Sequence, residues 1–227
     1  MLLPELRAEV VRYARKMYTS QLVQATQGNL SARDVESGLI CITPSGADYE
    51  RLTAEDIVVV DEQGNVVEGR WRPSVETPLH TLVLRKRRDI NCVMHTHSPY
   101  ATAFGVVYQP VPMVLAESAL CLGGDVPIAP YRMSGTPEFA ELVVQTLANG
   151  PAVIWGNHGA MVVGRNLPLT FSIAHALEDS AKVYAIAKQL GTPVVLPPDE
   201  VQKLHRFWVK NYGQKALEME VPENIES

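Results

Sequence analysis

Two histidines separated by a single residue are the most chemically informative feature of the chain. His95 and His97 follow an apolar run in the segment Val93-Met94-His95-Thr96-His97. Residues i and i+2 of an extended backbone project to the same face, so the two imidazoles would lie side by side at a strand end. Neutral imidazole is a common ligand of zinc-like ions, and the pair is therefore a candidate for two positions of one metal site.

A third histidine, His158, stands between glycines in the segment Gly156-Asn157-His158-Gly159, again directly after an apolar run. Three histidines and an open fourth position are typical of a catalytic metal site rather than a closed structural one. The alternative is that each histidine is an ordinary structural residue. The same-face pair together with a histidine in a glycine-flanked loop favours the metal site.

The segment 73–80 carries a carboxylate, Glu76, just before a helix predicted to begin at Thr77-Pro78. A carboxylate there can simply stabilise the helix dipole, whereas beside a metal it can remove or return a proton. His80 follows one helical turn later and points to the same side. We assign His80 to packing or to support of the site rather than to the metal.

Small polar residues in predicted tight turns form the next candidate element: Gly28-Asn29-Leu30-Ser31, Pro44-Ser45-Gly46 and Ser74. Such turns present backbone N–H groups and hydroxyls to an anion, typically a phosphate. Each turn is ordinary by itself, but together they predict a neutral phosphate cradle. The helix predicted to begin at Ser98-Pro99 adds an N-terminus, which favours anions, beside His97.

The elements that position these residues alternate between helices and strands. Helical spacing and proline at first-turn positions predict helices at 5–21, 77–88, 98–106, 136–148, 169–190 and 198–211. Apolar runs and a turn at Gln63-Gly64 predict strands at 39–43, 57–61, 65–67, 91–96, 111–115, 126–129, 151–155 and 160–164. Thr77, Ser98 and Thr136 each precede proline, which predicts three N-caps. The interleaving predicts an α/β sandwich around a mixed sheet.

Composition narrows the class of protein. The 227 residues are 46% hydrophobic and contain no linker-like stretch, so we expect one domain over 1–227 with a polar tail, about 213–227, that is mobile. A net charge of −5 disfavours a nucleic-acid partner. The three dispersed cysteines predict free thiols in a reduced, cytoplasmic setting. No apolar run approaches the ~18 residues that span a bilayer, so no membrane partner is expected.

The same short motifs, in this order, resemble the class II aldolase/adducin family, and most closely its L-fuculose-phosphate aldolase group. The motifs run over nearly the whole chain: Gly28-Asn29-Leu30-Ser31, Ile42-Thr43-Pro44-Ser45-Gly46, Pro73-Ser74-Val75-Glu76, His95-Thr96-His97, Ala129-Pro130-Tyr131 and Asn157-His158-Gly159. Several motifs in a fixed order are far more specific than any one of them.

The resemblance implies a three-layer α/β/α fold with a central mixed, largely antiparallel sheet, and a homotetramer with active sites at subunit interfaces. It implies metal-dependent aldol cleavage of a ketose 1-phosphate to dihydroxyacetone phosphate and an aldehyde, through a metal-stabilised enediolate. Zinc, or Mn²⁺ or Co²⁺, would be held by His95, His97 and His158, with Glu76 as the acid/base. The residues implied to bind the substrate phosphate are Asn29, Ser45, Gly46 and Ser74. Tyr212 matches a tyrosine that reaches the neighbouring subunit's site.

Two departures from the family pattern affect the expected substrate. Members with a strong phosphate site often carry two consecutive serines where this chain has Ser74-Val75, so one hydroxyl is lost. The fuculose enzymes carry a tyrosine acid in the segment that here reads Leu115-Ala116-Glu117-Ser118. Glu117 is a candidate for that proton transfer, with an interface salt bridge or a solvated side chain as the alternative. The aldehyde and the sugar configuration stay open.

Other reactions on the same scaffold are the first alternative: a sugar-phosphate epimerase, a dehydratase or a sugar-acid-phosphate decarboxylase. The resembling epimerases typically place aspartate where this chain has Glu76, which favours the aldolase. Val75 and Glu117 depart from the aldolase pattern, so the dehydratase and the decarboxylase stay as alternatives. A non-catalytic domain of the adducin type, which lacks the metal ligands, is less consistent with the three histidines.

Overall fold

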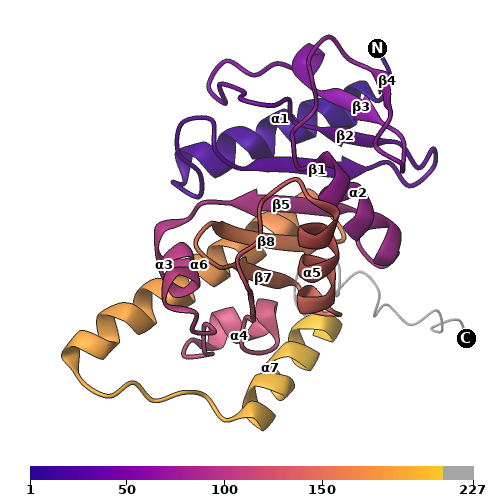
Figure 1. Cartoon of the computed structure of the whole chain (residues 1–227). Helices are drawn as coiled ribbons and strands as arrows, with labels where there is room; N and C mark the ends of the chain where they lie inside the picture. Colours follow the sequence, from indigo (N-terminus) through magenta and orange to yellow (C-terminus); the bar gives the residue numbers. More distant parts are fainter. Residues whose placement is uncertain (212–227) are drawn as a thin grey trace, which may run out of the picture.

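The centre of the molecule is one eight-stranded sheet in the order β4-β3-β2-β1-β5-β8-β7-β6 (Figure 1). In the computed structural model, which describes residues 1–211, only the β6–β7 pair among the described strands is parallel. The strands are β1 (Asn29–Arg33), β2 (Ile40–Ile42), β3 (Val58–Val60), β4 (Val66–Glu68), β5 (Cys92–Thr96), β6 (Ile128–Ala129), β7 (Ala152–Trp155) and β8 (Gly159–Gly164). The predicted mixed, largely antiparallel sheet is confirmed.

Helices cover both faces of the sheet (Figure 1). The helices are α1 (Pro4–Thr19), α2 (Thr77–Lys86), α3 (Pro99–Val107), α4 (Ala116–Leu122), α5 (Pro137–Leu147), α6 (Leu167–Leu190) and α7 (Pro198–Asn211), with a 3₁₀ turn at Ala54–Asp56. α2 and α5 pack on one face, and α1, α3 and α6 on the other. This is the predicted three-layer α/β/α arrangement. Within the described part of the chain, no helix is both long and apolar enough to span a bilayer.

The central strands are buried on both faces, which explains their continuous apolar sequences. Alternate residues of β5 face opposite layers: Val93 packs with α2 and α5, and Met94 packs with α1 and α6. His95 therefore shares the face of Val93, beneath the start of α2. The pleat of β5 thus aims the first histidine at the helix that begins beside Glu76.

Two sequence predictions about local structure were wrong, and one helix was missed. Asn29, Leu30 and Ser31 lie in β1 rather than in a tight turn, because their backbone pairs with β2 and β5 and Leu30 is buried. The predicted strand at 111–115 reduces to a single bridge between Val111 and Val126. Helix α4, directly after it, was not predicted.

Of the three predicted N-caps, only one makes the expected side-chain hydrogen bond. Thr136 accepts a hydrogen bond from the backbone N–H of Phe139 (3.2 Å) and caps α5 as expected. Thr77 does not cap α2, because its hydroxyl donates to the carbonyl of Ser74 (2.6 Å). Ser98 occupies the cap position of α3 but makes no side-chain capping bond.

Candidate metal centre and active site

Strand pairing fixes His95 in the middle of the sheet. His95 lies opposite Asn29 of β1 on one side and Met161 of β8 on the other. Only 1% of His95 is exposed. Its ring is held by the backbone because Nδ1 lies 2.9 Å from the carbonyl oxygen of Ala160. A strand bonded on both sides gives this imidazole a rigid support.

Glycine at two positions lets the neighbouring backbone approach β5. A Cβ at Gly28 would lie 2.6 Å from the carbonyl oxygen of His95, and the φ of Gly28 is +73°. A Cβ at Gly159 would collide with the carbonyl oxygen of Thr96 and lie 3.0 Å from Cε1 of His95. Both glycines are therefore required by the close packing around His95 rather than by turn formation alone.

Three histidines converge at the end of β5. His97 follows the strand, and its backbone N–H donates to the carbonyl of Leu22 (2.9 Å). His158 stands in the tight β7–β8 turn, where Asn157 adopts a φ of +56° that asparagine tolerates. One ring nitrogen from each of the three histidines lies within 4.8 Å of the others, and the Nε2 atoms of His95 and His97 are 2.9 Å apart.

The donor set fits a divalent metal. The carbonyl oxygen of Ala160 can only accept, so Nδ1 of His95 carries the proton and Nε2 presents its lone pair to the cluster. Burial, with the neighbouring His95 and His158, lowers the pKa of His97 to about 3. Burial and His95 also lower the pKa of His158. The imidazoles of His97 and His158 are thus neutral at physiological pH, which is the state that binds metal.

An aromatic side chain, Trp155, packs against the histidine cluster. The indole of Trp155 stacks on the ring of His95, with centroids 4.2 Å apart and planes inclined by 22°. Trp155 is 1% exposed and also contacts the rings of Phe139 and His158. This packing restricts rotation of the His95 imidazole. In the sequence Trp155 is only the end of an apolar run, and no local signal assigns it a role in the site.

Glu76 lies beside the histidine cluster, as expected. Its Oε2 is 3.6 Å from Nε2 of His95, and its Oε1 is 4.0 Å from Nε2 of His158. Oε2 accepts a hydrogen bond from Nδ2 of Asn29 (2.8 Å), and Oε1 accepts one from the hydroxyl of Ser134 (2.7 Å). Both oxygens of the buried carboxylate therefore have a donor as well as a histidine neighbour.

The electrostatics keep Glu76 ionised. Burial raises its pKa, but the electrostatic interaction with His95 and the hydrogen bonds from Asn29 and Ser134 outweigh burial and lower the pKa to about 2. A metal cation held by the three histidines would act in the same direction. An ionised carboxylate next to a cation site is the state required of a general base.

His80 is a buried neighbour of the site and is not one of the clustered histidines. Its Nδ1 lies 2.7 Å from the hydroxyl of Ser31, and the side chain is completely buried. Burial lowers the pKa of His80 to about 3, so the ring is neutral. This placement agrees with the predicted role in packing and support rather than in metal binding.

The four residues expected to bind phosphate lie along the ends of β1 and β2. The N–H of Thr43 donates to the carbonyl of Leu30 (3.0 Å), and the hydroxyl of Thr43 accepts from the N–H of Leu30 (3.1 Å). The carbonyl of Thr43 accepts from the N–H of Ser74 (3.1 Å). The N–H of Ser45 donates to the carbonyl of Arg72 (3.0 Å), which ties the turn 44–46 to the segment 72–74. This network brings together Asn29, Ser45, Gly46 and Ser74. Ser45 and Gly46 are exposed, and Asn29 and Ser74 are buried.

Of the two further residues expected to take part in catalysis, Glu117 and Tyr212, only Glu117 lies among the described residues. Glu117 is exposed on α4 and lines a hollow of about 830 Å³ with Phe171, Arg165 and Trp208. The three clustered histidines do not line that hollow. Tyr212 lies outside the described residues, as does the tail 213–227. The described fold therefore groups the three candidate metal ligands with Glu76 and the residues expected to bind phosphate, and Glu117 lines a separate hollow.

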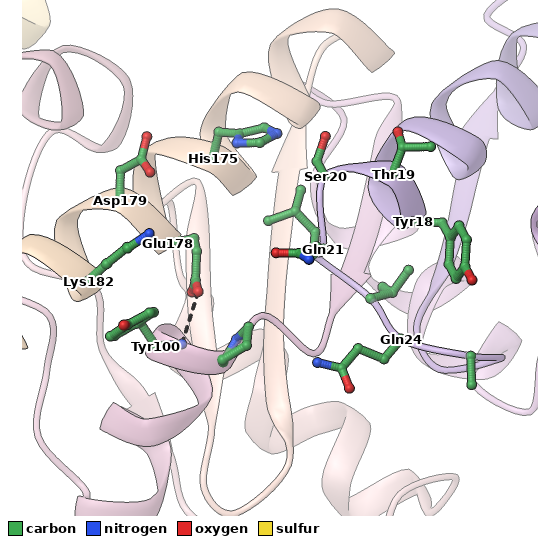
Figure 2. A pocket seen from close by; sticks show the side chains of 14 residues that line it. Tyr18, Thr19, Ser20, Gln21, Gln24, Tyr100, His175, Glu178, Asp179 and Lys182 are labelled. Atoms are coloured by element: carbon green, nitrogen blue, oxygen red, sulfur yellow. Dashed lines mark hydrogen bonds between the residues drawn. The ribbon is translucent and has the colours of Figure 1, made fainter.

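A second hollow, of about 660 Å³, lies beside α6 and the start of α3 (Figure 2). Here the carboxylate of Glu178 accepts hydrogen bonds from the backbone N–H groups of Tyr100 (3.0 Å) and Ala101 (2.9 Å). Glu178 therefore caps the helix that follows His97. The N-terminus of α3 was expected to favour anions, and the anion bound there among the described residues is the carboxylate of Glu178 from α6.

The comparisons with known proteins agree with this geometry. The Class II Aldolase and Adducin N-terminal domain family matches residues 8–185. The chain is 37% identical over 215 residues to a 5-deoxy-D-ribulose 1-phosphate aldolase of Bacillus thuringiensis serovar kurstaki, covering 95% of this chain and 100% of that protein. It is 34% identical to a 5-methylthioribulose-1-phosphate/5-deoxyribulose-1-phosphate aldolase of Rhodospirillum rubrum, covering 93% and 94%.

A solved structure of an L-fuculose 1-phosphate aldolase has the same fold. Its TM-score is 0.87 at 36% identity, and the match covers 90% of this chain and 96% of that one. The chain belongs to the class II aldolase/adducin family. The resemblance inferred from the short motifs is thereby confirmed.

Proposed function

We propose that the protein is a metal-dependent aldolase that cleaves a ketose 1-phosphate into dihydroxyacetone phosphate and an aldehyde, and also catalyses the reverse condensation. The observation that carries the proposal is the position of Glu76, an ionised buried carboxylate within 4.0 Å of two of three converging histidines. A site that only binds a metal for structure has no need of such a carboxylate. An adducin-like binding domain has no need of either.

His95, His97 and His158 would hold the cation, with zinc as the expected metal and Mn²⁺ or Co²⁺ as alternatives. Bound there, a divalent cation supplies a Lewis acid that stabilises the negative charge left on the substrate when a carbon–carbon bond breaks. Neutral imidazoles leave the cation its full charge, which suits that role.

Glu76 carries out the proton transfer at carbon. In cleavage, a base accepts the proton of the C4 hydroxyl, the C3–C4 bond breaks, and C4 becomes the aldehyde carbon. Glu76 takes up a proton from solvent and delivers it to C3, which completes dihydroxyacetone phosphate and leaves the carboxylate ionised again. In condensation, the ionised carboxylate removes that proton again, and its lowered pKa of about 2 keeps it ready to do so.

The substrate phosphate would bind at Ser45, Gly46, Ser74 and the second N–H of Asn29. The Ser74 hydroxyl accepts from the N–H of Glu76 (3.2 Å), so its own proton is available for a phosphate oxygen. Val75 supplies no hydroxyl, and its side chain is 70% exposed. Phosphate binding therefore depends on fewer hydroxyls than in relatives with paired serines.

The names of the two curated relatives suggest the substrate class. Both act on 5-deoxyribulose 1-phosphate, a five-carbon ketose phosphate. Cleavage of that sugar between C3 and C4 gives dihydroxyacetone phosphate and a two-carbon aldehyde, acetaldehyde. We propose the same small, apolar aldehyde class for this protein. Glu117 and Tyr212 would act across subunit interfaces of a homotetramer, with Glu117 as a second acid/base, and the protein would work in the cytoplasm.

A direct assay tests the proposal. The purified metal-loaded protein is incubated with 5-deoxyribulose 1-phosphate, fuculose 1-phosphate and ribulose 5-phosphate, and dihydroxyacetone phosphate is measured with a coupled dehydrogenase. We expect release from the ketose 1-phosphates, with the deoxyribulose sugar preferred. The Glu76→Gln variant should keep its metal and lose about 10²–10⁴-fold in turnover. Formation of only an epimer, a dehydrated product or CO₂ would refute the aldolase.

A further inference from the structure

We propose that Ser134 is a positioning residue that fixes the carboxylate of Glu76 for proton transfer at carbon, an inference that rests on the proposed aldolase function. The Ser134 hydroxyl donates to Oε1 of Glu76 (2.7 Å) from a loop 58 residues away in sequence. Neither the motifs nor the phosphate cradle include this residue. The contact is therefore an additional part of the site.

The carboxylate is held from two sides. Asn29, from β1, donates to Oε2, and Ser134, from the loop between β6 and α5, donates to Oε1. A single donor would leave the carboxylate free to turn about the bond that joins it to the side chain. With one donor on each oxygen, the plane of the carboxylate is fixed relative to the histidine cluster. Asn29 is rigid because its strand is paired on both sides.

The loop that carries Ser134 is anchored at both ends. At its start, the backbone N–H of Tyr131 donates to the hydroxyl of Tyr108 (3.0 Å), at the end of α3. At its end, Thr136 caps α5. Between these anchors Tyr131 is 56% and Met133 is 72% exposed, whereas Ser134 is half-buried and turned inward onto Glu76.

The exposure of the loop's side chains distinguishes two explanations for the contact between Ser134 and Glu76, namely simple packing of the loop and positioning of the carboxylate. If the loop were merely packed against the core, large side chains would be buried in it, but its largest side chains point outward. The inward group is a small hydroxyl whose hydrogen bond, among the described residues, goes to the catalytic carboxylate. Positioning of the base to within a fraction of an ångström is worth up to about 10²-fold in rate. This sets the expected size of the effect.

The test uses a half-reaction, proton exchange at carbon without aldehyde, in which Glu76 is the proposed base. Metal-loaded protein is incubated with dihydroxyacetone phosphate in D₂O without aldehyde, and exchange of the C3 proton is followed by NMR. We expect Ser134→Ala to slow the exchange about 10- to 100-fold at saturation, with KM changed less than about twofold. Ser134→Thr, which restores a hydroxyl, should recover most of the rate. Metal content and melting temperature are measured for each variant.

Thr146→Ala is the matched control, because it removes a half-buried hydroxyl of α5 that donates to the carbonyl of Leu142 (2.8 Å) and leaves Ser134 and both anchors of its loop in place. It should leave the exchange rate near that of the wild type. Wild-type exchange by Ser134→Ala, or equal losses in Ser134→Ala and Thr146→Ala, would overturn the positioning role. No exchange by the wild-type protein would instead overturn the proposed function on which it rests.

Discussion

Replacing Gly28 by alanine tests how tightly the sheet holds His95, the first candidate metal ligand. The new Cβ would lie 2.6 Å from the carbonyl oxygen of His95, against an ordinary carbon–oxygen contact of about 3.3 Å, so the two strands must separate by roughly 0.7 Å. Overpacking of this kind costs about 1–3 kcal/mol. The left-handed φ of +73° adds about 1 kcal/mol. The expected loss of stability is therefore about 2–4 kcal/mol.

Gly38→Ala separates the two contributions. Gly38 has the same φ of +73°, but no atom lies within 4 Å of the position that a Cβ would take there. It should cost only the backbone contribution, about 1 kcal/mol, and leave the metal site untouched. The two variants thus share the backbone strain and differ in the collisions of the new Cβ at position 28 with Cγ1 of Val23, a side chain that can shift, and with the backbone carbonyl of His95.

Metal affinity is the decisive assay for this pair. Metal–nitrogen distances tolerate only about ±0.2 Å, so a displaced His95 should weaken zinc binding about 10- to 100-fold in competition with a chelator. Urea unfolding of the metal-free proteins gives the stability difference separately. If Gly28→Ala binds zinc as tightly as Gly38→Ala, the inference that β1 fixes the position of His95 is incorrect.

Two further predictions concern the surroundings of the site. The pKa of His80 is about 3 in the folded protein and about 6.5 when unfolded, so the unfolded state binds the extra proton and stability falls as pH drops from about 6.5 toward 3. His80→Gln should reduce that slope in metal-free protein by up to about 1.4 kcal/mol per pH unit, and an unchanged slope would contradict a neutral buried ring. Glu178→Ala should cost about 1 kcal/mol in urea unfolding because it uncaps α3, whereas Asp179→Ala, one residue along α6, should cost less than half of that. Equal costs would argue against the cap.

The parts of the site that lie close together in sequence were predictable. The strand parity of His95 and His97 placed both rings on one face, and the position of Glu76 before a helix placed it at the mouth of the site. These inferences needed only the period of an extended backbone and the start of a helix. The structure bears out the grouping of the three histidines and the sheet that carries them.

The parts that depend on distant contacts were not predictable. Asn29 was assigned to a turn because Gly28 and polar neighbours imitate one, while its strand character comes from pairing with β2 and β5. The local Ser98-Pro99 signal located the start of α3 correctly, but the cap comes from Glu178, 78 residues away from Tyr100. Ser134 sits in a loop without periodicity, and only the fold brings it to Glu76.

We expect His95, His97 and His158 to bind one divalent cation together. The most direct measurement is zinc stoichiometry and affinity for the wild-type protein and for the three single alanine variants, with His175→Ala as a histidine control outside the cluster. We expect one zinc per chain in the wild type and in the control, and loss of tight binding in each of the three variants with the fold retained by circular dichroism. Tight binding that survives any one of the three replacements would contradict the account.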